Sequence, residues 1–441
     1  MCRAGTSKGG NCQVEAEACE GDIGLNLFLN GLQRSAGPAS PPVSNDWRLT
    51  VLAGVTWAAW LVGAGLTLSS AVRRLAVERE FAIYEYLEFI GNFWAQSPLY
   101  VPESLHGFHY LPIMLIIGSP LSLINIQLAG GIFGLLSVVF FSFSVFRLAQ
   151  QIVPTHSFAA AGAILVISLM AAVIALRLPQ MQMPMTAAMI CATAAGMRED
   201  WRAFVVWLLL AVALKPLAIV MALLAIATMP RMRVPLIAGI AALLLLPFAV
   251  QNWSYLVSEY VNYVRQLLHI TDADPGVWGN QAEFSTLLNT LGLELGPHIR
   301  LTIRLGAALG TLWLAWRIAL ERNPRATSFA LLLLSSCYIG LFNPRQEGMS
   351  FLVVVPGLAA LSLWFLARNL ADWRGWLWMA LAVMVGLKWG ARQAMWILPA
   401  TMVPIWIGFL VLTLNPRRWC ELLSGQPAHL AAIPAEPKPV A

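Results

Sequence analysis

Length, composition and charge together exclude a soluble protein. The chain has 441 residues, of which 59% are hydrophobic and only 11% are charged, and its mean hydropathy is +0.70. A soluble core of this size would need a charged shell, so ordinary soluble enzymes are excluded. The net charge of +6 comes from basic residues in short loops between long apolar runs, a pattern that sets membrane topology and does not indicate nucleic-acid binding.

The two ends of the chain differ in composition from its middle. Residues 1–45 are polar and rich in Gly, Ser and Pro, and they lack the short apolar stretch and cleavage site of a signal peptide. We expect a disordered cytoplasmic tail over 1–45, a transmembrane domain over 46–415 and a cytoplasmic C-terminal tail over 416–441. The six cysteines have neither CxxC spacing nor a nearby His pair, so they encode neither a zinc site nor a disulfide framework.

Long apolar runs between these tails predict helices. Runs of about 15 to 25 residues fit membrane-spanning helices, whereas barrel strands would alternate apolar and polar residues over about ten. The sequence therefore predicts an all-α polytopic membrane protein of about 12 transmembrane helices with outer-face loops. The predicted apolar segments lie near 49–71, 126–146, 157–176, 183–197, 203–229, 234–251, 299–320, 326–342, 349–367, 375–390 and 395–414.

Basic residues in the connecting loops predict the orientation, because cytoplasmic loops are enriched in Lys and Arg. Only one path of the chain through the membrane, here called the threading, places all of these loops on the cytoplasmic side. In it the N-terminus is cytoplasmic and the segment 203–229 is a tight hairpin that turns near Lys215 and Pro216. Proline lacks a backbone N–H and disfavours helix at the preceding residue, which supports a break there. The cytoplasmic basic residues are then Arg147, Arg198, Arg202, Arg231, Arg233, Arg322, Arg325, Arg368, Arg374, Arg417 and Arg418.

The same threading collects the chemically interesting residues on the opposite, outer face. Cytoplasmic loops are short and almost purely basic, whereas the outer connections are long or carry mixed polar residues. A functional site is therefore predicted at the outer face, built from several loops that are far apart in the sequence. These outer connections are the loop 73–109, the link 177–182, the tip at Lys215, the loop 253–298 and the turn 343–348.

Four short islands in these outer connections carry a family resemblance. They are residues 80–84 with Leu99 and Tyr100; residues 108–112, which read Phe-His-Tyr-Leu-Pro; residues 177–182 followed by Leu214, Lys215 and Pro216; and residues 279–281, which read Gly-Asn-Gln. Their order and spacing resemble the C-type superfamily of multi-spanning glycosyltransferases, in particular the family 87 polyprenyl-phosphate-dependent mannosyltransferases. Two places depart from that pattern. Glu80 stands where the family has Asp, and residues 345–347 read Arg-Gln-Glu where relatives often show a Trp and a His.

The resemblance implies a membrane hexosyltransferase. It would move a hexose, with mannose as the first expectation, from a polyprenyl phosphate donor to a glycan or lipid acceptor. The reaction would take place on the outer or periplasmic side of the plasma (inner) membrane, with membrane lipids and no nucleic acid as partners. A secondary transporter is the alternative from another class, although the sequence shows no internal repeat. A polysaccharide polymerase or ligase of similar architecture is the other alternative.

Carboxylates in the first outer loop are the candidate bases. Transfer of a sugar needs a group that takes the acceptor's hydroxyl proton. Glu80 is the predicted general base, because it occupies the acidic position of the family pattern, and Glu85 is the second candidate. The alternative for Glu80 is a surface carboxylate paired with Arg79 or Arg73.

Cations in the outer turns are candidates for binding the donor phosphate. Lys215 interrupts a strongly apolar run, so it needs an anionic partner or a water-filled cavity, unless it extends to the interface. Arg177 and Arg345 occupy outer turns against the positive-inside tendency, and their planar guanidinium groups suit phosphate oxygens. The alternative for these two arginines is contact with lipid headgroups.

Further polar residues complete the predicted substrate site. The amides of Gln180 and Gln182 could bond sugar hydroxyls, or they could cap helix ends. No motif requires a cofactor, although Asp272 and Asp274 leave a divalent cation open as an alternative to a simple turn. Neither GxGxxG nor GxxxxGK[ST] is present, which fits a lipid-linked donor. The resemblance also implies substrate contacts for Tyr84, Tyr110, Asn280, Gln281 and Asn343.

Overall fold

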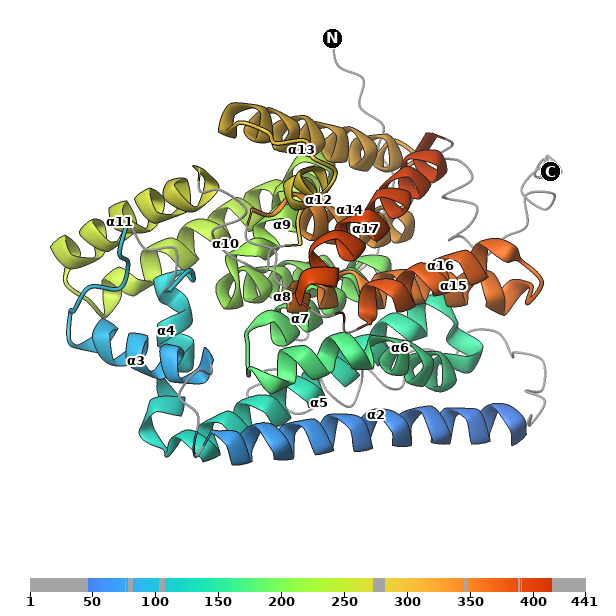
Figure 1. Cartoon of the computed structure of the whole chain (residues 1–441), viewed down its shortest axis with the longest axis horizontal. Helices are drawn as coiled ribbons and strands as arrows, with labels where there is room; N and C mark the ends of the chain where they lie inside the picture. Colours follow the sequence, from blue (N-terminus) through green and yellow to red (C-terminus); the bar gives the residue numbers. More distant parts are fainter. Residues whose placement is uncertain are drawn as a thin grey trace, which may run out of the picture. The chain divides into compact units, whose positions relative to one another are not determined.

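The computed structural model is helical throughout the part of the chain that it describes (Figure 1). It describes residues 47–75, 77, 82–102, 108–272, 282–344, 348–387, 389 and 391–414. Within these residues there are 16 α-helices and no strand. The predicted tails over 1–45 and 416–441 lie outside the described residues. The α-helices are α2 (Trp47–Arg74), α3 (Ala82–Trp94), α4 (Pro112–Gly118), α5 (Ile126–Ile152), α6 (Ser157–Arg177), α7 (Gln182–Met197), α8 (Trp201–Leu214), α9 (Ile219–Thr228), α10 (Arg233–Leu245), α11 (Trp253–Asp272), α12 (Phe284–Thr290), α13 (Pro297–Ala319), α14 (Pro324–Phe342), α15 (Val355–Arg368), α16 (Trp373–Gly386) and α17 (Ala391–Leu414).

Each predicted apolar segment falls on one or two of these helices, so the all-α polytopic fold is confirmed. Seven of the described helical segments are long and apolar enough to cross a membrane, and three others are shorter apolar helices, including α8 and α9. α7 and α13 fall outside both groups. α7 has only 16 residues, and α13 carries Arg300 and Arg304 in its first two turns. The count of about twelve crossings stays a prediction.

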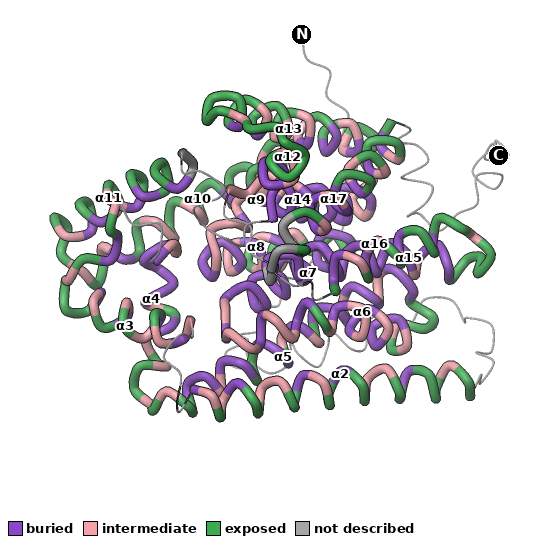
Figure 2. The backbone as a smooth tube through the Cα atoms, in the orientation of Figure 1, coloured by how far each residue is buried: buried purple, intermediate pink, exposed green. Residues whose placement is uncertain are grey.

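Helix α7 is the central helix of the described chain. All 16 of its residues are buried, and Figure 2 shows its tube in the colour of burial while α2 is largely exposed. Its sequence is rich in Ala, Thr and other small residues, which let neighbouring helices approach closely. At Gly196, for example, an added side chain would collide with Ser328 of α14 and Phe204 of α8. α7 therefore holds α5, α8 and α14 around one axis.

The predicted outer loops 73–109 and 253–298 contain helices of their own. α3, α4 and α11 lie near one another in Figure 1, and hydrogen bonds join α11 to the segment that follows α3. The carboxylate of Glu259 on α11 accepts hydrogen bonds from the backbone N–H groups of Leu99, at 2.8 Å, and Tyr100, at 3.2 Å. The hydroxyl of Tyr255 donates to the carbonyl of Ser97 at 2.8 Å. These bonds fix the segment after α3 against α11.

The predicted break at Lys215 is confirmed. α8 ends at Leu214, Lys215 is extended with φ −152° and ψ 122°, and a short 3-10 helix, η3 (Pro216–Ala218), leads into α9. The two halves are 14 and 10 residues long, or about 21 and 15 Å at 1.5 Å per residue. Either half alone would cross a bilayer of about 30 Å only where the bilayer is locally thinned.

Two cavities lie at opposite ends of the same helices. The first, here called the Lys215 cavity, is lined by the end of α8, the start of α9 and the turn that follows α14, among other segments. The second, here called the Arg231 cavity, receives the start of α8, the end of α9 and the start of α14. α14 has 19 residues, so its two ends are about 28 Å apart. This separation agrees with the threading, which predicts the first set of turns outside and the second inside.

Candidate functional site

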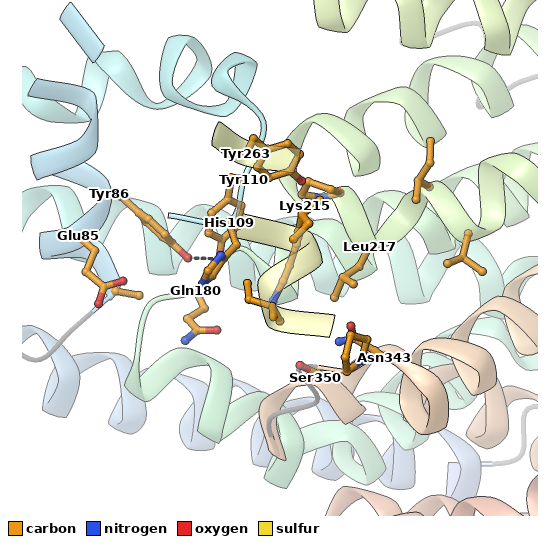
Figure 3. Close-up of a pocket in the computed structure, with 17 residues that line it drawn as sticks. Glu85, Tyr86, His109, Tyr110, Gln180, Lys215, Leu217, Tyr263, Asn343 and Ser350 are labelled. Atoms are coloured by element: carbon orange, nitrogen blue, oxygen red, sulfur yellow. Dashed lines mark hydrogen bonds between the residues drawn. The ribbon is translucent and has the colours of Figure 1, made fainter. Parts of the chain in front are cut away.

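The Lys215 cavity has a volume of about 360 Å³ and two unlike walls. One wall is polar and comes from α3, the segment before α4, the link before α7 and the segment after α14. The other wall is apolar and comes from η3, α9 and α11. The polar lining residues are Glu85, Tyr86, His109, Tyr110, Gln180, Lys215, Tyr263, Asn343 and Ser350, and all of them are labelled in Figure 3.

Lys215 is held in place by a buried amide. Its backbone N–H caps α8 by donating to the carbonyl of Ala211, and its Nζ donates to Oε1 of Gln182 at 3.0 Å. Gln182 is fully buried, and its Nε2 donates to the carbonyl of Ser350 at 3.3 Å. One glutamine at the start of α7 therefore joins the break after α8 to the segment that leads into α15. A lysine that bonds inward in this way lines the cavity and does not simply extend toward lipid headgroups.

Aromatic hydroxyls form the part of the polar wall that adjoins α3. The hydroxyls of Tyr86 and Tyr110 are 2.7 Å apart and hydrogen bonded, as Figure 3 shows. The backbone N–H of Met181 donates to the hydroxyl of Tyr86 at 3.3 Å, and Tyr100 donates to the carbonyl of Tyr110 at 2.6 Å. These contacts connect the first outer loop with the link before α7, so three separate islands of the sequence meet here.

His109 lies beside the tyrosine pair. Both of its ring nitrogens are buried, and neither has a hydrogen-bond partner within the described chain. Buried polar atoms are nearly always satisfied in proteins. An unsatisfied imidazole on a cavity wall therefore marks a place where a bound molecule, or a small rearrangement on its arrival, could supply a partner.

Of the two candidate bases, the structure places only Glu85 at the cavity. Glu85, in the first turn of α3, lines it. Glu80, the first choice from the sequence, lies outside the described residues, two positions before the first residue of α3. Tyr84 does not line the cavity, because its hydroxyl donates to the carbonyl of Leu75 at 2.6 Å. That bond ties the beginning of α3 to the residue that follows α2.

The apolar wall continues toward the exposed surface of the helices. Leu217 and Val220 line it from the side of α9, and Leu267 lines it from α11. Beyond them, Leu223 on α9 is 56% exposed and Leu268 on α11 is 61% exposed. Exposed apolar side chains of this kind face lipid in a membrane protein. The cavity is therefore bordered by a hydrophobic surface on one side.

Tyr263 contributes a hydroxyl to the α11 side of the cavity. Burial raises the pKa of Tyr263 well above its usual value, and the neighbouring Tyr260 adds to the effect. Tyr263 therefore stays protonated at neutral pH and can act as a hydrogen-bond donor, but it cannot act as a base there.

A buried ion pair supports the cavity from behind Asn343. Nη2 of Arg304 on α13 lies 2.8 Å from Oε2 of Glu283, the residue before α12. Burial raises the pKa of Glu283, while Arg304 acts in the opposite direction. The next residue, Phe284, packs against Phe342 with a ring distance of 5.4 Å. Because Phe342 directly precedes Asn343, this pair helps to fix the turn after α14.

The structure brings together part of the predicted site. Glu85, Tyr110, Gln180, Lys215 and Asn343 all line one cavity, although they come from five separate segments. Tyr84, Arg177 and Gln182 do not line it; Arg177 ends α6 and is partly buried. Lying outside the described residues are Glu80, Asn280, Gln281 and Arg345.

Four polar lining residues were not singled out from the sequence: Tyr86, His109, Tyr263 and Ser350. Tyr86 follows Tyr84 and Glu85 in an amphipathic stretch, and its inward position could have been inferred from helical spacing. His109 lies inside one of the family islands, but its type alone gives no role. Ser350 contributes its backbone carbonyl to Gln182, and no sequence signal predicts such a contact.

A metal site is not formed by the described residues. They contain no group of three or more His, Cys, Asp or Glu side chains that could hold an ion. Of the aspartates considered above, Asp272 is the last residue of α11 and Asp274 lies outside the described residues.

The fold and this cavity define a polytopic membrane protein with a polar site at one end of its helices. Comparison with known families identifies it further, because the model of glycosyltransferase family 87 matches residues 108–344. This match covers more than half of the chain, which therefore belongs to glycosyltransferase family 87. A search of curated proteins found no match. The protein is a membrane glycosyltransferase, and the matched region includes Tyr110, Gln180, Lys215 and Asn343 of the Lys215 cavity.

Proposed function

We propose that the protein transfers a hexose, mannose in the first instance, from a polyprenyl phosphate donor to a glycan or lipid acceptor at the outer face of the plasma membrane. One observation supports this proposal more than any other. Lys215, held by Gln182, stands in a cavity whose polar wall suits a sugar and a phosphate and whose other wall suits an isoprenoid chain. A soluble nucleotide sugar would have no use for the second wall.

The proposed reaction is a single displacement at the anomeric carbon of the donor sugar. An oxygen of the acceptor hydroxyl forms the new glycosidic bond, the bond from the anomeric carbon to the phosphate oxygen breaks, and polyprenyl phosphate leaves with the bonding electron pair. The hydroxyl proton passes to a carboxylate of the enzyme. The ammonium group of Lys215 stabilises the charge that develops on the leaving phosphate. Gln180, Asn343 and the hydroxyl of Tyr110 bind sugar hydroxyls in this scheme.

The proposal assigns the role of base to Glu80, with Glu85 as the alternative. Glu80 holds the acidic position of the family pattern, and in the sequence it lies two positions before the helix whose first turn lines the cavity. Glu85 lines the cavity itself. A base must come within about 3 Å of the proton that it takes, so the acceptor would approach along the α3 side of the cavity.

The apolar wall gives the lipid part of the donor a place to lie. Leu217, Val220 and Leu267 line the cavity, and exposed Leu223 and Leu268 extend the same surface outward. Each buried methylene contributes about 0.8 kcal/mol, so even a few isoprene units would add substantially to donor binding. This favours a lipid-linked donor over a free sugar phosphate.

The direct test is a transfer assay on the purified protein in detergent with a panel of labelled polyprenyl phosphate sugars. Release of polyprenyl phosphate that depends on an added glycan or lipid acceptor is the expected result. Transport of a sugar into proteoliposomes without release of polyprenyl phosphate would favour the transporter alternative instead. Transfer of a long glycan but not of a single hexose would favour the polymerase or ligase.

Substitution of the two carboxylates separates the candidates for the base. Glu80→Gln keeps the size of the side chain and removes its basicity, so transfer should fall about 100-fold to 10,000-fold. Donor binding should be unchanged, and Glu80→Asp should retain partial activity because the family has Asp at this position. Glu85→Gln, in the first turn of α3, is the matched variant. Loss of transfer in Glu85→Gln but not in Glu80→Gln would reverse the assignment, and retention in both would contradict the proposed mechanism.

A further inference from the structure

The Arg231 cavity lies at the end of the helices remote from the proposed chemistry. It has a volume of about 570 Å³ and is formed where three connections meet: the turn between α7 and α8, the segment between α9 and α10, and the turn between α13 and α14. Its lining residues are Glu199, Trp201, Thr228, Met229, Pro230, Arg231, Met232, Ala319, Arg322, Pro324 and Thr327. The transfer reaction proposed above uses none of them.

Two arginines on its lining have no partner within the described part of the chain. Arg231 and Arg322 are exposed, and their guanidinium groups make neither a hydrogen bond nor an ion pair there. Their neighbours differ. Arg233 donates to the carbonyl of Ile226 at 3.1 Å, and Arg325 donates to the carbonyl of Gln151 at 2.9 Å. Unlike Arg233 and Arg325, the two arginines that line the cavity are not bonded to backbone carbonyls, so their guanidinium groups are available to a ligand.

The only carboxylate on the lining, Glu199, does not neutralise them. It makes no ion pair with either arginine. The backbone also holds two of these charged residues in an uncommon conformation, since φ is +61° at Glu199 and +52° at Arg322. Non-glycine residues adopt such values in only a few per cent of cases, and they concentrate at functional turns.

The surroundings of the cavity are apolar and face lipid. Val234, at the start of α10, is 76% exposed, and Leu320, directly after α13, is 54% exposed. Leu223 lies on the exposed side of α9, which contacts both α10 and α13. A ligand that sits between the arginines can therefore place hydrocarbon chains against these helices. A small soluble anion would leave that surface without a role.

We propose that the Arg231 cavity binds the phosphate headgroup of an anionic phospholipid from the cytoplasmic leaflet. The guanidinium groups of Arg231 and Arg322 would hold the phosphate oxygens, and the acyl chains would lie along α9, α10 and α13. The positive-inside threading places these turns in the leaflet where anionic headgroups are recognised by basic pockets between helices. The proposal does not depend on the transferred sugar or on the base.

Lipid binding to the full-length protein in detergent tests this proposal, with native mass spectrometry as the readout and phosphatidylglycerol and phosphatidylcholine as the probes. The wild type should bind phosphatidylglycerol more tightly than phosphatidylcholine. Arg231→Gln with Arg322→Gln should weaken phosphatidylglycerol binding roughly thirty-fold, at about a factor of five to six for each arginine. The matched control is Arg198→Gln with Arg202→Gln, which removes the same charge at the same end of the helices but outside the cavity. Equal weakening by both pairs would overturn a specific site.

Two further variants separate binding from folding. Arg322→Gly removes the cation but suits the positive φ, so it should weaken phosphatidylglycerol binding while thermal stability stays the same or rises. Glu199→Gln removes a negative charge from the cavity and should strengthen binding a few-fold. Competition by glycerol 3-phosphate as strong as that by the lipid would assign the cavity to a free phosphate compound, contrary to the proposal.

Discussion

The two ends of α14 face cavities that use positive charge in opposite ways. At the Lys215 cavity the cation is partly buried and bonded to Gln182, and it shares the cavity with hydrogen-bonded tyrosine hydroxyls. At the Arg231 cavity the cations are exposed, and the described chain gives them no partner. A charge placed in an apolar span costs on the order of 3 kcal/mol, so it must be held by specific contacts. An exposed arginine costs little and can stay available for lipid.

The connections that build the two ends differ for the same reason. The Lys215 cavity combines two long connections that contain helices of their own with short links at Gln180, Lys215 and Asn343, and together they bring polar groups from five segments to one place. The Arg231 cavity is formed by short turns that carry basic residues. Long connections with helices of their own can position a substrate, whereas short basic turns mainly fix orientation and contact headgroups.

The largest effect is expected for membrane topology. The Lys215 cavity and the Arg231 cavity should lie on opposite sides of the membrane. In a variant without native cysteines, single cysteines at positions 215 and 231 should react with an impermeant maleimide from opposite sides of the membrane. The reason is that basic turns face the cytoplasm only if the chain reverses at Lys215. Reaction of both positions from one side would break the comparison, and with it the outer location of the site.

Ion pairs at the two ends should differ strongly in energy. Arg304→Gln removes the cation that is hydrogen bonded to buried Glu283 and leaves only the more weakly acting Arg300, so the variant should lose about 3 to 5 kcal/mol of unfolding free energy, measured by denaturant titration in detergent. Removal of Arg304 raises the pKa of Glu283 further, and a carboxyl with a raised folded pKa loses stability as pH rises. The deficit should therefore shrink at acidic pH. Arg304→Met with Glu283→Leu should recover most of the loss; failure to recover would indicate another role for Arg304.

Substitution of Lys215 tests whether the buried cation serves the reaction. Lys215→Gln removes one charge-assisted hydrogen bond, worth about 1.5 to 3 kcal/mol, so kcat/KM for transfer should fall about 10-fold to 150-fold. Arg202→Gln, an exposed change at the other end, is the control and should leave transfer within two-fold of wild type. Equal activity of the two variants would remove the distinction drawn between the two ends.

The smallest effect is expected at Asp372, the N-cap of α16, and its partner Arg374 in the first turn of that helix, an end that is predicted to be cytoplasmic. Hydrogen bonding from Arg374 lowers the pKa of Asp372, so this pair contributes stability above the unfolded pKa of 3.8 and loses it as pH falls through the folded value. Because Arg374 is 47% exposed, Asp372→Asn should cost less than about 1 kcal/mol near neutral pH. Thermal unfolding of the variant and the wild type should converge at low pH. A larger loss of unfolding free energy would mean that this pair contributes as much as the buried pair Glu283 and Arg304, contrary to the comparison.

The sequence predicted the helices and the break at Lys215 because both depend on local physical signals. Apolar runs, basic turns and the Lys-Pro step determine structure through residues that are close together in the sequence. The convergence of Glu85, Tyr110, Gln180, Lys215 and Asn343 followed from the threading together with the family resemblance. Contacts between distant buried groups could not be predicted in the same way. The bond from Lys215 to Gln182 depends on the rotation of α7 about its axis, which no sequence pattern of a fully buried helix reveals.

The absence of any lipid-facing side on α7 has a consequence for biogenesis. With 16 residues and a high content of small and hydroxyl side chains, α7 does not qualify as an independent apolar span. The insertion machinery would gain little from releasing it alone into the bilayer. α7 becomes buried only when α5, α8 and α14 have packed around it, and α14 comes much later in the sequence. We therefore expect the first half of the chain to stay loosely assembled at the translocon until α14 has been synthesised, so that truncation before α14 should yield a protein that quality-control proteases remove.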